Sequence, residues 1–146
     1  MARILVALDD SCGSEKALQA AVKLAQQDGG RLTAVTVLEQ TGNAAVDRLT
    51  EEIKAQAKTA LEELLQTAVN YARARGVRLT PMLREGHPAE TIIRCAEEEK
   101  ATLLVLGASS LANGEPGLGG TADQVSNYCP CTVMIAKTAE RDAEEP

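Results

Sequence analysis

The sequence predicts an α/β domain of Rossmann-like architecture, with one doubly wound, five-stranded parallel sheet and helices on both faces. Two short runs, at 4–8 and 102–106, are apolar apart from Thr102, which is typical of strands buried on both faces. Between the expected strands, apolar residues recur at helical spacing, so the order of elements is βαβαβαβαβ. Helices of crossover length between short strands indicate a parallel sheet. The length of 146 residues fits one domain.

The first half of the chain contains two expected strands and two expected helices. Ser11 and Ser14 are candidate N-caps of the first helix, and Gly29-Gly30 follows its last apolar residue. The second helix carries one apolar stripe with a period of about 3.6 residues, and Gly76 is its expected end. In order, these elements are a strand at 4–8, the first helix, a strand at 32–38, a polar stretch at 39–47 and a helix at 49–75.

Proline residues position the elements of the second half. Pro81 makes the expected strand at 77–84 an edge strand or an interrupted one, because proline cannot donate to a sheet. Pro88 suits the first position of the next helix, after a turn in which we expect His87 to be solvated. The later elements are a strand at 102–106, a helix at 121–127 and a strand at 132–136. We expect one domain over residues 1–138 and a frayed acidic tail at 139–146.

Aromatic residues are scarce: the chain has two tyrosines, no Phe and no Trp, and one histidine. Proteins that bind single-stranded nucleic acid need aromatic side chains on which bases stack, and Tyr71 and Tyr128 supply almost none. The net charge of −6 has the wrong sign for a phosphate-backbone partner. A Cys₂His₂ zinc site needs a second histidine, which the chain lacks. We therefore expect no nucleic-acid partner.

The first residues are not expected to form a signal peptide or a membrane anchor. The apolar run after Arg3 stops at Asp9, whereas a signal peptide needs at least about 7 apolar residues. No run approaches the ~18 apolar residues that span a membrane. We expect a cytoplasmic protein without membrane insertion, whose four cysteines are reduced thiols. The spacing of Cys129 and Cys131 is weak evidence for metal, and no metal site is predicted.

A glycine-rich segment at 107–121 joins one strand to the next helix. Glycine lets the backbone approach a ligand closely, and free amides at a helix N-terminus suit an anion such as phosphate. The alternative is a surface loop without a ligand, and composition alone does not separate the two. The segment is not a Walker A loop, since it has no lysine, and it lacks the Rossmann pattern G-x-G-x-x-G. Ligands of doubly wound sheets bind at the carboxyl ends of strands, which makes Asp9, Val37 and the residues after Leu106 candidates for one site.

Four segments of the chain carry a known pattern: Val6-Ala7-Leu8-Asp9-Asp10-Ser11, Thr36-Val37-Leu38, Glu85-Gly86-His87-Pro88-Ala89-Glu90-Thr91-Ile92 and Cys129-Pro130-Cys131-Thr132-Val133. Together with the order of elements, they resemble the universal stress protein family over Ala2 to Lys137. The resemblance implies a fold like that of the adenine-nucleotide α-hydrolases. It also implies a homodimer paired through the last strand, Val133 to Lys137. An apolar, β-branched strand at the chain's end is also the kind of exposed edge that needs a partner.

The nucleotide-binding branch of that family carries the pattern G-x₂-G-x₉-G-[S/T]. Gly107 matches its first glycine, and Gly120 and Thr121 match its final pair at the right distance. Ser110 replaces the second glycine, and where that position needs a positive φ, serine costs on the order of 1 kcal/mol. The loop carries Glu115 and none of the family's usual basic residues, so backbone amides, a threonine hydroxyl and Mg²⁺ would have to hold the phosphates. The resemblance implies that ATP binds at Ala7, Leu8, Asp9, Val37, Leu106, Gly107, Ser110, Gly120, Thr121 and Ala122.

The resemblance also implies individual roles at this site. Asp9 would bond the ribose or the adenine edge, although a carboxylate near the start of the first helix also favours the helix dipole. Val37 would offer backbone groups to adenine. Neither tyrosine lies in the expected pocket, so the base would rest between aliphatic walls such as Ala7, Leu8 and Val37, and Tyr128 is expected to pack beside the last strand.

Two functions follow from these expectations. The favoured one is a regulatory module of the stress response that holds ATP, acts with an unknown regulatory protein partner and is not an enzyme. The alternative is a dimeric adaptor of the same fold that binds no nucleotide and acts through protein partners. Gly107, Gly120 and Thr121 favour the first function, whereas Ser110 and the missing basic residues favour the second.

Overall fold

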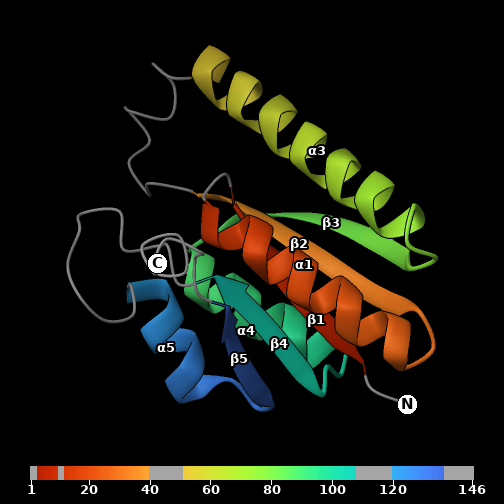
Figure 1. Ribbon diagram of the computed structural model, residues 1–146. Coiled ribbons are helices and arrows are strands. Elements are labelled where there is room, and N and C mark those ends of the chain that lie inside the picture. Colours follow the sequence, from red (N-terminus) through yellow and green to blue (C-terminus); the bar gives the residue numbers. More distant parts are fainter. Residues whose placement is uncertain (1–2, 10–11, 40–50, 108–119, 137–146) are drawn as a thin grey trace, which may run out of the picture.

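A computed structural model describes residues 3–9, 12–39, 51–107 and 120–136. The elements are β1 (Ile4–Leu8), α1 (Cys12–Gln27), β2 (Arg31–Glu39), α3 (Glu51–Arg73), β3 (Arg78–Gly86), α4 (Pro88–Glu98), β4 (Leu103–Gly107), α5 (Gly120–Tyr128) and β5 (Thr132–Ala136). The strands form one parallel sheet in the order β3-β2-β1-β4-β5 (Figure 1). This arrangement confirms the predicted five-stranded α/β fold.

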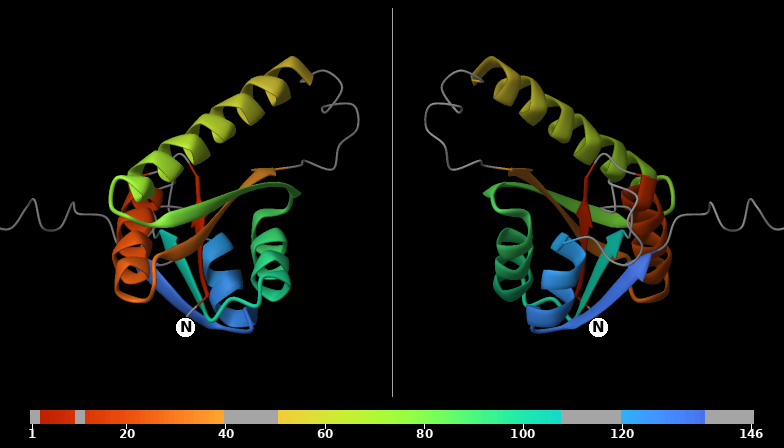
Figure 2. Two further views of the ribbon diagram at one scale, coloured as in Figure 1. Left: turned by 90° about the vertical axis from the view of Figure 1, so that its right-hand side faces the viewer. Right: turned by 90° about the vertical axis from the view of Figure 1, so that its left-hand side faces the viewer.

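Two layers of helices cover the sheet, and each encloses a hydrophobic core. On one face, α1 and α3 pack over Ile4, Val6 and Leu8 of β1. On the other face, α4 and α5 pack over Leu5 and Ala7, and the two layers are seen edge-on in Figure 2. Every residue of β1 is therefore buried, as a strand in the middle of a doubly covered sheet requires.

Glycine and proline residues lie at the ends of helices and at the edge of the sheet, as predicted. Gly30 and Gly76 have φ values of +82° and +76°, a conformation that glycine adopts without strain, and they follow α1 and α3. Pro81 lies in β3, which is an edge strand. Pro88 is the first residue of α4, which begins after the exposed His87. Where the structure describes the residues on both sides of an element's end, the expected end is thus confirmed to within two or three residues.

The prediction that Ser14 caps α1 is wrong. Ser14 is the third residue of that helix, and its hydroxyl accepts the N–H of Asp9, at the end of β1. It therefore fastens the helix to the strand that precedes it. Ser11, the other candidate cap, lies outside the described residues, as do the polar stretch from residue 40 to 47 and the acidic tail at 139–146.

The apolar stripe of α3 is buried over only part of its length. Leu65, Ala68 and Ala72 are buried against β2 and β3, whereas Ile53 is 62% exposed. Figure 2 shows the helix axis diverging from the sheet toward its amino end. The amino-terminal half offers mostly alanine to a core and so gains little from burial, although Lys54 pairs with Glu85 of β3 at 3.3 Å on the surface.

No helix in the described part of the chain is long and apolar enough to cross a membrane.

Candidate functional site

The direction in which successive strands are added to the sheet reverses between β1 and β4, and this position is the switch point of the sheet. The chain runs from β1 through β2 to β3 on one side and reaches β4 and β5 on the other. In sheets of this kind, ligands bind outside the carboxyl ends of the strands on either side of that point. Asp9 directly follows β1, Gly107 ends β4, and Val37 lies near the end of β2. The structure thus brings these three predicted residues to one edge of the sheet, with the Asp9 side chain exposed.

Gly107 permits a close approach between β4 and the first turn of α1. A Cβ atom on this residue would overlap the carbonyl group of Gly13 and lie 2.8 Å from the Ser14 nitrogen. These neighbours are backbone atoms, which cannot rotate away as a side chain can. The glycine therefore has a packing role at this edge, independent of any ligand.

Two buried hydroxyl groups form hydrogen bonds with backbone groups at the carboxyl end of β1. The Thr36 hydroxyl, on β2, donates to the Leu8 carbonyl at 2.8 Å, and Thr36 is only 1% exposed. From the α1 side, the Ser14 hydroxyl acts as an acceptor and bonds the Asp9 N–H. These links hold the end of β1 from both sides. Sequence reasoning placed Thr36 in the Thr36-Val37-Leu38 segment and gave its side chain no role; a small hydroxyl residue at the carboxyl end of a buried strand was the available signal.

The remaining predicted site residues differ in what they can offer a ligand. The side chains of Ala7, Leu8 and Leu106 are buried in the two cores, whereas Val37 is half-buried. An adenine ring could therefore meet Val37 and backbone groups at this edge, but little of the other aliphatic side chains. Gly120, Thr121 and Ala122 form the first turn of α5, and Ser110 lies outside the described residues.

Tyr128 does not pack beside the last strand as expected. It is 74% exposed and lines a groove of about 600 Å³ with His87, Pro88 and Gln124, between α4 and α5. Val125 of α5 is fully buried and packs in the core. Tyr128 is the last residue of the helix. The groove is separate from the carboxyl ends of β1 and β4.

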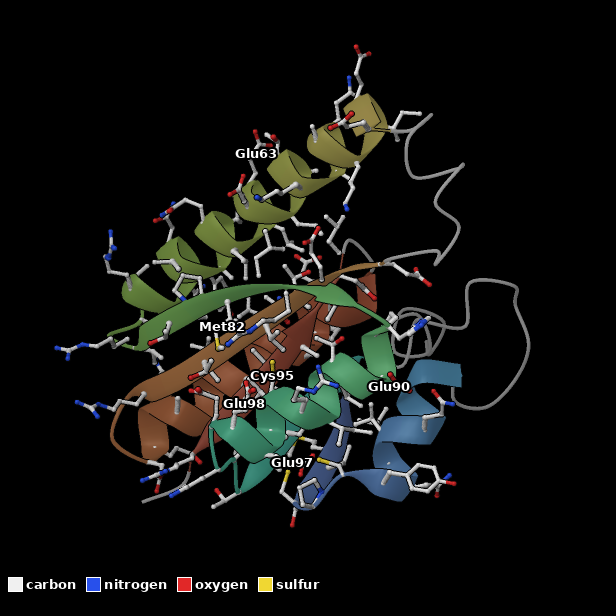
Figure 3. The ribbon with its side chains drawn as sticks, turned by 180° about the vertical axis from the view of Figure 1, so that it is seen from behind. Glu63, Met82, Glu90, Cys95, Glu97 and Glu98 are labelled. Atoms are coloured by element: carbon white, nitrogen blue, oxygen red, sulfur yellow. The ribbon has the colours of Figure 1, made fainter. Side chains whose placement is uncertain are left out.

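The three cysteines whose side chains the structure describes are free thiols in two different settings. Cys95 is buried between α4 and the sheet with Met82, and burial raises its pKa (Figure 3). Cys129 and Cys131 lie with their Sγ atoms 3.3 Å apart. Burial, followed by the hydrogen bond to Cys129, raises the pKa of Cys131 to about 12. Within the described ranges, no three His, Cys, Asp or Glu side chains are placed to share a metal ion.

The raised pKa of Cys131 predicts slow alkylation of the folded protein. At pH 8 this thiol is therefore almost entirely protonated, whereas the thiolate is the reactive form. Iodoacetamide labelling followed by peptide mass spectrometry should show Cys131 modified far more slowly in the folded chain than in guanidinium. Since the folded state keeps this proton from pH 9.0 to about 12 while the unfolded state loses it, stability should fall as pH rises through that window. Equal labelling rates of Cys131 in the folded and unfolded chain would contradict a raised pKa of this thiol in the folded protein.

An open parallel sheet with helices on both faces and a switch point at its centre defines a Rossmann-like α/β domain. The chain belongs to the universal stress protein family, because the family's sequence model matches residues 1–137. It is 32% identical over 145 residues to the universal stress protein YxiE of Bacillus subtilis, with 92% of this chain and 98% of that protein covered.

Solved structures share the fold. The universal stress protein UspA from Lactobacillus plantarum superposes with a TM-score of 0.85 at 24% identity, covering 92% of this chain and 97% of that one. A family protein from Arabidopsis thaliana with AMP bound has a TM-score of 0.72 at 18% identity, covering 97% and 95%. A universal stress protein in complex with cAMP has a TM-score of 0.70 at 21% identity, covering 92% and 96%. At these identities the likeness concerns the fold.

Proposed function

We propose that this chain is an ATP-binding regulatory module without catalytic activity. The observation that carries the proposal is the junction at the carboxyl edge of the sheet. There, Asp9 and Gly107 lie at the ends of two neighbouring central strands, and Gly120 begins the helix that follows β4. Membership of the universal stress protein family supports it. So do the AMP and cAMP named for two structures of the same fold.

The residues at this edge suit an adenine nucleotide. The exposed carboxylate of Asp9 can accept hydrogen bonds from ribose hydroxyls. The half-buried Val37 offers backbone groups and one aliphatic contact to adenine. The amides of the first turn of α5, from Gly120 to Ala122, would hold the phosphates together with the Thr121 hydroxyl. Bound Mg²⁺ would neutralise part of the phosphate charge in a protein whose net charge is −6.

The test is native mass spectrometry of gently purified protein, followed by calorimetric titration with Mg·ATP. We expect a co-purified adenine nucleotide or a saturable heat at millimolar ATP. The chain lacks Phe and Trp, so no such ring stacks on the base, and affinity should be modest. No bound nucleotide together with no heat would overturn the proposal. AMP in the spectrum, with no heat from ATP, would change the nucleotide assigned to the site.

We propose further that the domain spans residues 1–138, with the acidic segment 139–146 outside it. The protein acts in the cytoplasm, where a regulatory protein partner responds to its nucleotide state. The family membership supports the role in the stress response.

The last strand predicts a homodimer. β5 is an edge strand, and its residues Val133 to Ala136 are only half-buried, so aliphatic surface lies beside a strand edge that no other described strand pairs with. Pairing of Val133 to Lys137 with a second copy would cover both. Light scattering at micromolar concentration should give twice the chain mass of 15.4 kDa. A monomeric mass across a dilution series would contradict the dimer.

A dimeric adaptor that binds no nucleotide is the second candidate function. Ser110 favours it, because serine replaces a glycine of the nucleotide-binding pattern. In that case, the half-buried β5 edge and the protein partner carry the function, and the carboxyl edge of the sheet stays without ligand. A dimer by light scattering with no heat from Mg·ATP is the result that favours the adaptor.

A further inference from the structure

Three arginines form a row at the amino edge of the sheet, opposite the edge proposed for the nucleotide. Arg31 and Arg78 are direct partners in the register of β2 and β3. Leu5 pairs with Thr33 across β1 and β2, so Arg3, two residues before Leu5, lies level with Arg31. Neighbouring strands are about 4.8 Å apart, so the three backbones span roughly 10 Å. We call these three residues the arginine row.

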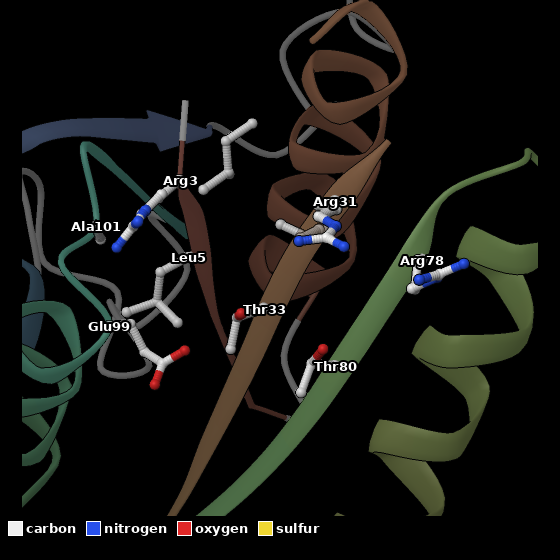
Figure 4. Close-up of a pocket in the computed structure, with 10 residues that line it drawn as sticks. Arg3, Leu5, Arg31, Thr33, Arg78, Thr80, Glu99 and Ala101 are labelled. Atoms are coloured by element: carbon white, nitrogen blue, oxygen red, sulfur yellow. The ribbon is translucent and has the colours of Figure 1, made fainter. Parts of the chain in front are cut away.

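The arginine row borders an open depression on the face of the sheet that carries α4. Residues two apart on a strand point to the same face, so the next positions beyond the row are Leu5, Thr33 and Thr80. Leu5 belongs to the core beneath α4 and α5, which identifies the face. These residues, with Glu99 after the end of α4, surround a volume of about 580 Å³ (Figure 4). That volume is within the range of small-molecule sites.

The backbone of the row is held in place at both ends. The Arg3 N–H donates to the Thr102 hydroxyl at 2.9 Å, and the Arg3 carbonyl accepts the Thr102 N–H at 2.9 Å. The Arg78 N–H donates to the Gly30 carbonyl at 2.7 Å, directly before Arg31. These bonds fix the backbone positions from which the Arg3 and Arg78 side chains extend. A ligand would therefore meet arginines whose backbone spacing is set by the sheet.

The local charge is opposite to that of the whole protein. Three arginines and one acidic residue, Glu99, line the depression, whereas the chain as a whole carries a net charge of −6. Among the described residues, the ion pairs are Lys54–Glu85 and Arg84–Glu98, so none involves the arginine row. Like charges opposite each other on neighbouring strands destabilise a sheet. An anion between Arg31 and Arg78 would remove that repulsion.

We propose that the arginine row is a binding site for a small anion with two or more phosphoryl groups. The planar guanidinium group binds phosphate oxygens through paired hydrogen bonds, which a neutral or cationic ligand could not use. The Thr33 and Thr80 hydroxyls lie one row deeper and can donate to the same oxygens. A single phosphate would reach fewer of the three arginines, whose backbones span roughly 10 Å. Glu99 opposes the anion and thereby limits the affinity.

The test is calorimetric titration of the full chain with inorganic tripolyphosphate and, separately, orthophosphate. We expect tripolyphosphate to bind more tightly than orthophosphate. The double variant Arg31→Gln/Arg78→Gln should weaken tripolyphosphate binding by roughly 100-fold, because it removes charged hydrogen bonds at two positions. Glu99→Gln should tighten it several-fold, an effect in the opposite direction that loss of folding cannot produce.

A matched control separates this site from the general charge of the protein. Lys23→Gln/Arg94→Gln removes the same charge from two exposed positions outside the depression and should change the affinity by less than about 3-fold. Gly120→Val, at the opposite edge, should leave tripolyphosphate binding unchanged. Equal losses in the two double variants, or no saturable heat with the unmodified chain, would overturn the proposal. Loss on Gly120→Val alone would assign tripolyphosphate to the other edge.

Discussion

Replacement of Gly107 by alanine is expected to lower the free energy of unfolding by at least about 3 kcal/mol. The added Cβ would overlap the Gly13 carbonyl group and lie 2.8 Å from the Ser14 nitrogen, all atoms of the α1 backbone. Relief requires α1 to move away from β4, and the same helix packs over β1 in the core. Urea denaturation followed by circular dichroism measures the effect, which corresponds to a fall in Tm of roughly 10 °C.

Gly76→Ala is the matched control for this substitution. It adds the same methyl group where nothing lies within 4 Å, but at a φ of +76°. Only the strain of the left-handed conformation should appear, about 1 kcal/mol. A Gly107→Ala protein that denatures at the same urea concentration as the unmodified chain would contradict the close packing of β4 on α1. If Gly107→Ala yields no soluble protein and Gly76→Ala does, this result also supports a larger loss of stability at Gly107 than at Gly76.

The packing at Gly107 changes how the glycine pattern is interpreted. The residue matches the first glycine of the nucleotide-binding pattern, but its backbone contact with α1 requires glycine with or without a ligand. Loss of ATP binding in a Gly107 variant would therefore not distinguish a ligand contact from a shift of α1. The same holds for Ser14 and Thr36, whose hydroxyls hold the end of β1. A test of the nucleotide needs a residue outside this packed junction.

The sequence predicted the fold because the signals were local. The continuous apolar runs of β1 and β4 indicated that both faces of the sheet would be covered. Pro81 predicted an edge strand or an interrupted one, and β3 is an uninterrupted edge strand. Gly30 and Gly76 marked helix ends because their positive φ values disfavour other residues. Each of these properties is determined by the residue and its near neighbours, so no knowledge of distant contacts was needed.

The parts that sequence reasoning missed depend on contacts between distant elements. Periodicity located the apolar stripe of α3 but could not tell that Ile53 has no core to enter. The arginine row exists only because the register aligns Arg31 with Arg78, residues far apart in the chain. The position of Tyr128 in a groove beside α4 depends likewise on how α4 and α5 pack. At the candidate site, the sequence located Asp9, Val37 and Gly107 at one edge, whereas the links from Ser14 and Thr36 depend on how β1 packs between α1 and β2.

Gly120→Val is expected to abolish Mg·ATP binding, with a loss of at least roughly 100-fold in affinity. Gly120 is the first residue of α5, where backbone amides are free of helical partners and can meet phosphate oxygens. A branched side chain there would stand between those amides and the ligand. The circular dichroism spectrum should not change, since the residue lies at the helix end rather than in the junction of β4 with α1. Calorimetric titration with Mg·ATP measures the loss.

Two further variants determine what such a loss means. Ser126→Ala changes an exposed residue in the body of α5 and should bind Mg·ATP like the unmodified chain. Ser110→Gly restores the second glycine of the pattern and should tighten binding, because glycine adopts a positive φ at no steric cost. Weaker binding by Ser110→Gly would show that the hydroxyl itself contacts the ligand. Unchanged binding by Gly120→Val would remove the start of α5 from the site and leave Asp9 and Val37 as the residues to test next.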